Sequence, residues 1–217
     1  MAGFEDFHGD TSTVPYSLED QITLFLQCLR KQTIPSGPRK GQMYDSITLI
    51  GHSIGSYILL ELIRRTHQLS SPIKITAGIL LFPTVTHISQ SPSGVKITQL
   101  FRIQDFPRKA SIAAKALVAL APTPALRWLV GLVTGMPAQA AVVTTSFLKS
   151  RIGVWQALHM ARDEMETITE DNWGEEIWGV EHEDLDQKQT PPKLVFYFGQ
   201  NVSIITLLSC PFQTDHV

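Results

Sequence analysis

Strand-like hydrophobic runs and helical hydrophobic patterns alternate along the first hundred residues, and a further strand-like run follows near residue 195. Three short runs rich in β-branched and aromatic residues, at 45–50, 74–82 and 193–198, have the length and composition of buried strands. Residues 18–30 and 56–65 instead repeat their apolar positions with a helical period. Ser17 and Asp20 have the spacing of a capping box before the first of these helices. This alternation predicts an α/β fold with a parallel sheet and right-handed crossovers.

The pattern becomes helical after the second strand-like run. Residues 84–94 contain Ser, Thr and Pro and are expected to form a loop. Two apolar helical arms follow at 112–121 and 125–136, separated by Pro122 and Pro124, and residues 138–166 predict one or two further helices. We therefore divide the chain into a core segment 1–100, a helical insertion 101–190, a returning core strand 191–200 and a divergent tail 201–217.

Composition and charge narrow the possible functions. The chain has 217 residues and a net charge of −2, which argues against a general nucleic-acid binder. Cys28 and Cys210 form neither a disulfide framework nor a metal-binding pattern, and His182 lies in an acidic run without ligand partners at useful spacing. We therefore expect no metal and no cofactor. The N-terminus lacks a signal-peptide pattern, and no apolar run reaches the ~18 residues of an ordinary transmembrane helix.

The first strand-like run leads directly into Gly51-His52-Ser53-Ile54-Gly55, a G-x-S-x-G motif. A strand, a sharp turn and a helix are the setting of a nucleophile elbow, in which the turn holds a serine in a strained conformation. We expect Ser53 to be the nucleophile, the backbone N–H of Ile54 to be an oxyanion donor, and the glycines to let strand and helix pass closely. His52 either lines the oxyanion region or packs as a turn residue. The alternative for the whole motif is a glycine-flanked turn with a solvent-exposed serine.

Several stretches together resemble the lipid-droplet-associated serine hydrolase family, a branch of the α/β-hydrolases. The matching stretches are Ile50-Gly51-His52-Ser53-Ile54-Gly55-Ser56-Tyr57, Leu80-Leu81-Phe82-Pro83-Thr84, residues 88–94 and residues 196–199. The resemblance implies an incomplete α/β-hydrolase fold, with a partial parallel sheet flanked by helices and a helical cap inserted after the second strand. It also implies a Ser/Asp/His triad that hydrolyses ester bonds of neutral lipids or sterol esters. The implied location is the cytoplasmic face of the lipid droplet, with the endoplasmic reticulum as a second site.

Two members of that triad are not found where the resemblance places them. The acid should follow the strand ending at Phe198, but residues 199–205 contain no carboxylate. The histidine should come later, where Asp215 and His216 are adjacent in sequence and therefore poorly placed to converge on one serine. His87, on the loop after the second strand, is another candidate base. We expect a truncated member with impaired catalysis. The alternatives are a non-catalytic lipid-droplet surface-binding protein and an acyltransferase that uses the same elbow.

The two apolar arms within residues 110–136 are a second candidate site. Leu117, Trp128, Leu129 and Leu132 are the candidate lipid-surface residues, and basic residues flank the first arm. A broken apolar hairpin with basic flanks is typical of a segment that enters a membrane or droplet surface without crossing it. The alternative is a cap subdomain that packs over the active site and is buried like any core.

Overall fold

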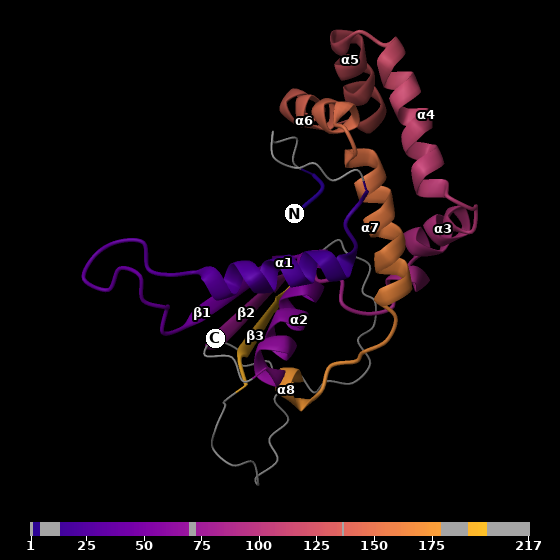
Figure 1. Ribbon diagram of the computed structural model, residues 1–217. Coiled ribbons are helices and arrows are strands. Elements are labelled where there is room, and N and C mark those ends of the chain that lie inside the picture. Colours follow the sequence, from indigo (N-terminus) through magenta and orange to yellow (C-terminus); the bar gives the residue numbers. More distant parts are fainter. Residues whose placement is uncertain (1, 5–13, 70–72, 136, 179–190, 199–217) are drawn as a thin grey trace.

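In its described residues, the computed structural model contains a parallel three-stranded sheet in the order β1-β2-β3, at the end of the molecule away from α4, α5 and α6 (Figure 1). The structure describes residues 2–4, 14–69, 73–135, 137–178 and 191–198. The strands are β1 (Ile47–His52), β2 (Ile75–Leu81) and β3 (Lys193–Tyr197), with Gly51 opposite Leu80 and Leu81 opposite Tyr197. The three strands and their parallel pairing are confirmed, with ends shifted by one or two residues from those expected.

Three helices pack on one face of this sheet: α1 (Leu18–Lys31), α2 (Ile54–Gln68) and α8 (Glu175–Trp178). One apolar cluster joins α1 to α2 and includes Leu18, Ile22, Ile58 and Leu62. A second cluster joins α2 to the sheet and includes Leu59, Leu60, Ile63, Leu80 and Trp173. Side chains alternate along a strand, so the opposite face carries Ile50, Val195 and Tyr197, which are exposed in the described part of the chain.

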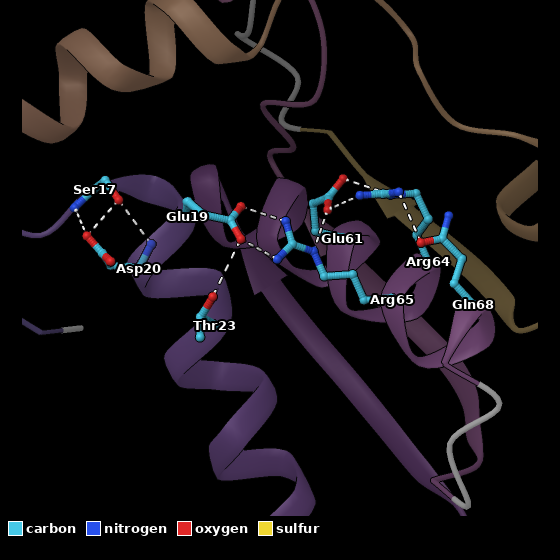
Figure 2. A network of polar contacts seen from close by, with 8 residues as sticks. All are labelled: Ser17, Glu19, Asp20, Thr23, Glu61, Arg64, Arg65 and Gln68. Atoms are coloured by element: carbon cyan, nitrogen blue, oxygen red, sulfur yellow. Dashed lines mark hydrogen bonds and ion pairs between the residues drawn. The ribbon is translucent and has the colours of Figure 1, made fainter.

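Polar contacts fix the start of α1 against α2 (Figure 2). The expected capping box is present, because the Ser17 hydroxyl accepts from the Asp20 N–H and the Asp20 carboxylate accepts from the Ser17 N–H. The Arg65 guanidinium donates to both carboxylate oxygens of Glu19, at 2.6 Å, and to Glu61 at 2.9 Å. The hydrogen bonds from Arg65 lower the pKa of Glu19. The Arg65–Glu19 pair joins the two helices and is exposed on the Glu19 side, so it contributes little stability, whereas Arg65–Glu61 is a partly buried pair within α2.

The segment after β2 is more helical than the sequence predicted. It contains the 3-10 turn η1 (Ile88–Gln90), α3 (Pro92–Phe101), α4 (Phe106–Leu120), α5 (Thr123–Thr134), α6 (Ala138–Lys149) and α7 (Gly153–Thr167). The loop expected at 84–94 is therefore wrong in part. The Ser91 hydroxyl accepts from the Gly94 N–H at 2.9 Å and Pro92 occupies the first turn, so α3 begins inside the expected loop. The break between the two apolar arms is confirmed at Ala121 and Pro122, and residues 138–166 form two helices.

Helices α4, α5 and α6 lie at the end of α7 that points away from the sheet (Figure 1). We call these three helices the lobe. The apolar contact inside the lobe joins Leu126 and Val130 of α5 to Ala141 of α6, with Val118 of α4 packed against it. The second predicted arm therefore packs mainly on the helix that follows it, and α4 packs mainly along α7. Helix α7 connects the lobe to α1 and η1.

Two buried glutamines fasten the N-terminal segment to the helices. The Gln156 side chain of α7, which is fully buried, accepts from the Tyr16 N–H at 2.7 Å and donates to the Tyr16 C=O at 2.8 Å. Gln21 of α1 makes the same pair of bonds to the backbone of Ala2. Each amide thus satisfies a donor and an acceptor of the chain at once, as a neighbouring strand would.

Replacing Gln156 by Leu is expected to lower the free energy of unfolding by about 1–3 kcal/mol, because a side chain of similar volume removes both bonds to Tyr16 in a buried site. Urea denaturation followed by circular dichroism measures the change. Gln27→Leu on the exposed face of α1 is the matched control and is expected to stay within about 0.5 kcal/mol. Equal effects of the two substitutions would show that the Gln156 contact does not stabilise the fold.

Candidate active site

Ser53 occupies the single residue between β1 and α2. Its backbone has φ 53° and ψ −121°, outside the regions that residues other than glycine usually adopt. The Ser53 N–H donates to the Leu81 C=O at 2.9 Å, and the Ser53 C=O accepts from the Ser56 N–H at 2.9 Å. The strained geometry expected from the motif is therefore confirmed, and it ties the serine to the neighbouring strand and to the first turn of the helix.

The two glycines of the motif have different environments. A Cβ atom on Gly51 would lie 2.4 Å from the Gly55 carbonyl oxygen and 2.7 Å from the Ser56 nitrogen, both of them backbone atoms. The buried Ser56 hydroxyl also donates to the Gly51 C=O at 3.1 Å. A Cβ atom on Gly55 would meet nothing within 4 Å in the described part of the chain. The close passage of strand and helix thus requires glycine at position 51 and does not require it at position 55.

Thr84 is the side chain that contacts the Ser53 hydroxyl, with Oγ1 and Oγ 3.4 Å apart. The Thr84 N–H also donates to the Ser53 C=O at 3.4 Å. Phe82, directly after β2, has a positive φ of 47°, and Thr84 follows it two residues later. The Ser53–Thr84 contact was not predicted from the sequence. The one sequence signal for it is the position of Phe82-Pro83-Thr84 directly after a buried strand.

The two candidate histidines near the elbow do not hydrogen-bond to Ser53 in the described structure. His52 is exposed, and its ring meets the edge of the Phe82 ring at 5.8 Å between centroids. His87 has a left-handed backbone at φ 48°, and its Nδ1 lies 3.2 Å from the Gln90 side-chain nitrogen. Residues 199–205, His182, Asp215 and His216 lie outside the described residues. The geometry therefore assigns neither the acid nor the base.

The described carboxyl groups include one with a strongly changed pKa, Glu164 on α7. Burial, with a smaller contribution from neighbouring Asp163, raises the pKa of Glu164 to about 7. Asp163 itself accepts from the Leu18 N–H at 2.6 Å and so joins α7 to α1. Among the described residues, no group of three or more His, Cys, Asp or Glu side chains is arranged to hold a metal ion.

The four candidate lipid-surface residues are on the outside of the lobe. Leu117 is 71 % exposed, Trp128 68 %, Leu132 65 % and Leu129 48 %. These four side chains are therefore exposed in the described structure, whereas Leu126 and Val130 of the second arm are buried. Trp128 and Leu132 also line an open groove between α5 and α6. No single helix in the described residues is long and apolar enough to cross a membrane, although the bent pair α5 and α6 reaches that length and composition together.

A serine at positive φ between a parallel strand and a helix has the backbone geometry of a nucleophile elbow, an arrangement typical of the class of α/β-hydrolases. The family follows from comparison with known proteins. Residues 1–203 match the family described as lipid-droplet associated hydrolase, and the chain belongs to that family. No solved structure matches the chain.

The curated relatives are longer than this chain. The lipid droplet-associated hydrolase of Gallus gallus is 31 % identical over 156 residues, which are 70 % of this chain and 43 % of the relative. The human protein of the same name is 43 % identical over 85 residues, which are 39 % of this chain and 22 % of the relative. The chain thus spans less than half the length of these relatives.

The two elbow glycines give a matched pair of substitutions. Gly51→Ala is expected to lower the free energy of unfolding by about 3 kcal/mol or more, because its Cβ meets backbone that cannot move without separating β1 from α2. Gly55→Ala is expected to change it by less than about 1 kcal/mol, because its Cβ enters open space in a helix, where Ala is favoured over Gly. Chemical denaturation of both variants measures the difference. Equal tolerance of the two would contradict the close contact at Gly51.

Proposed function

We propose that the chain is an ester hydrolase in which Ser53 is the nucleophile. The Ser53 oxygen attacks the ester carbonyl, its proton passes to a base, and the carbon–oxygen bond to the alcohol breaks as that alcohol takes up a proton. Water then releases the acyl group from the serine. The observation that carries this proposal is the strained backbone of Ser53, because a simple turn between a strand and a helix does not require a serine at positive φ.

Ile54 is the proposed oxyanion donor. It is the first residue of α2, so its N–H has no acceptor within the helix and lies at the positive end of the helix dipole. The negative charge that develops on the carbonyl oxygen during attack is stabilised by such a donor. The proposed elbow is thus Gly51, His52, Ser53, Ile54 and Gly55, with the reaction at the side chain of Ser53 and the backbone of Ile54.

The proposed substrates are esters of neutral lipids or sterols, and the proposed partner is the surface of the lipid droplet. The family name supports the location, and the exposed apolar side chains of the lobe support contact with lipid. A droplet has a single phospholipid layer over oil, so helices can enter it and return without crossing a bilayer. Esters dissolved in that oil are the substrates that a protein at this surface meets.

We further propose that this chain by itself turns over esters slowly. The hydroxyl that contacts Ser53 belongs to Thr84, and a neutral threonine does not remove a proton at neutral pH. In the described residues no base is hydrogen-bonded to Ser53, and a serine hydroxyl that no base activates is a weak nucleophile. The Ser53–Thr84 contact also favours a second candidate function. In it, the chain is a non-catalytic protein that retains the elbow and binds the droplet surface through the lobe.

A fluorophosphonate probe tests Ser53. The chain is expected to be labelled at Ser53, about 10²–10⁴-fold more slowly than the longer Gallus gallus relative, because a general base contributes rate enhancements of this size. Ser53→Ala is expected to remove the label, and Ser46→Ala, on the exposed approach to β1, to retain it. Labelling that persists in Ser53→Ala would contradict the assignment of the nucleophile. Labelling as fast as that of the relative would contradict the proposed impairment.

Droplet binding tests the lobe. In fat-storing cells, a fluorescent fusion of the full chain is expected to concentrate on droplets. Replacing Leu117, Leu129 and Leu132 together by Asp should reduce the droplet fraction roughly tenfold or more, because each substitution removes apolar burial and adds a charge. All three side chains are exposed in the described structure, so the fold should persist. The control replaces Leu24, Met43 and Leu69, exposed apolar residues outside the lobe, by Asp. Unchanged targeting of the lobe variant would show that these side chains do not contact lipid.

A further inference from the structure

Charge is divided unevenly between residues 106–162, which hold the lobe and the first part of α7, and the rest of the chain, which includes Asp105 before α4 and three acidic residues at the end of α7. From Phe106 to Arg162 the sequence contains seven Lys and Arg residues and no Asp or Glu. The rest of the chain has eleven basic and twenty acidic residues, a net charge of −9. A chain that is nearly neutral as a whole therefore carries a strongly positive helical region.

The basic side chains of the lobe are not neutralised by acids within the described structure. The Lys115 ammonium donates to the Arg151 C=O, and the Lys149 ammonium donates to the Thr123 hydroxyl. Both acceptors are neutral oxygens, so the hydrogen bonds place these cations without cancelling their charge. On α7, an ion pair joins Arg162 to Glu166, at the end of the helix closer to the sheet. The positive field of the lobe is thus available to an external anion.

Arg127 lies where this charge meets the apolar surface. It lines the open groove between α5 and α6 together with Trp128, Leu132 and Val142. Trp128 is mostly exposed. Exposed indole rings and basic side chains beside aliphatic ones are characteristic of helices that lie in a lipid interface, where the cation meets a phosphate and the ring lies at the level of the headgroups.

We propose that the lobe recognises phospholipid surfaces of net negative charge, with Arg127 and Lys149 contacting anionic headgroups while the apolar side chains of α4, α5 and α6 enter the acyl region. This inference rests on the proposed droplet-surface role and names the lipid that the surface must contain. Each basic residue close to an anionic leaflet contributes roughly fivefold to binding, and the contribution falls as salt is added.

Flotation with reconstituted droplets tests the inference. Triolein droplets are coated either with phosphatidylcholine alone or with phosphatidylcholine containing about one fifth phosphatidylserine, an anionic lipid of cytoplasmic leaflets. The full chain is expected to bind the anionic droplets roughly tenfold or more tightly at low salt, and to lose most of that difference at high salt. Arg127→Gln with Lys149→Gln is expected to reduce binding to anionic droplets by roughly 10–30-fold and to leave binding to neutral droplets almost unchanged.

The matched control is Lys31→Gln with Lys40→Gln, which removes the same charge from exposed positions outside the lobe and is expected to bind like the unmodified chain. Circular dichroism confirms that both double variants fold. Equal binding to neutral and anionic droplets would overturn this inference and leave the proposed droplet partner standing. Equal losses in the two double variants would overturn the assignment to the lobe. Failure to bind either droplet would overturn the proposed droplet partner, and this inference with it.

Discussion

The close contact between the backbone of β1 at Gly51 and the first turn of α2 is the constraint on which the candidate site depends. The strand and helix approach so closely that even one added carbon at Gly51 would collide with the Gly55 carbonyl. One residue is left to reverse the chain between them, and it is Ser53, at positive φ. A strain of about 1–3 kcal/mol at such a residue persists only if its surroundings are rigid. Leu59 and Leu60 of α2, packed against Leu80 of β2, provide that rigidity.

The features that the sequence predicted correctly depend on local patterns. The strand-like runs, the capping box at Ser17 and the strained turn at Ser53 each follow from residues that are neighbours in sequence. The contact from Thr84 to Ser53 could not be predicted in this way, because it joins residues 31 positions apart and follows Phe82, a residue type that rarely adopts positive φ. Likewise, an apolar helix does not reveal its partner, so the pairing of α5 with α6 came only from the structure.

The lobe exposes both large apolar side chains and basic side chains, and water solvates the basic ones well but the apolar ones poorly. Large apolar side chains project from all three of its helices, and contiguous patches of this kind on a protein surface usually mark a binding site. The basic side chains among them face no acid in the described part of the lobe, so they repel one another unless anions approach. Burying the lobe in a protein core would satisfy the apolar side chains but desolvate the cations. An interface between lipid and water satisfies both, and this supports the proposal that the lobe contacts a lipid surface.

Helix α7 connects the lobe to the part of the chain that holds the elbow at Ser53. Near the start of the helix, Gln156 accepts from the Tyr16 N–H, and near its end Asp163 accepts from the Leu18 N–H, so α7 is fastened to α1 and to the segment that leads into it. Just beyond the helix, the Thr169 C=O accepts from the His87 N–H, three residues from the threonine that contacts Ser53. These contacts are short and involve backbone atoms, so a lobe held at a surface would also fix the direction in which the elbow faces. For the proposed ester hydrolase, a fixed orientation of this kind would hold Ser53 at a constant distance from substrates in the lipid phase, which shortens the search for a reactive geometry.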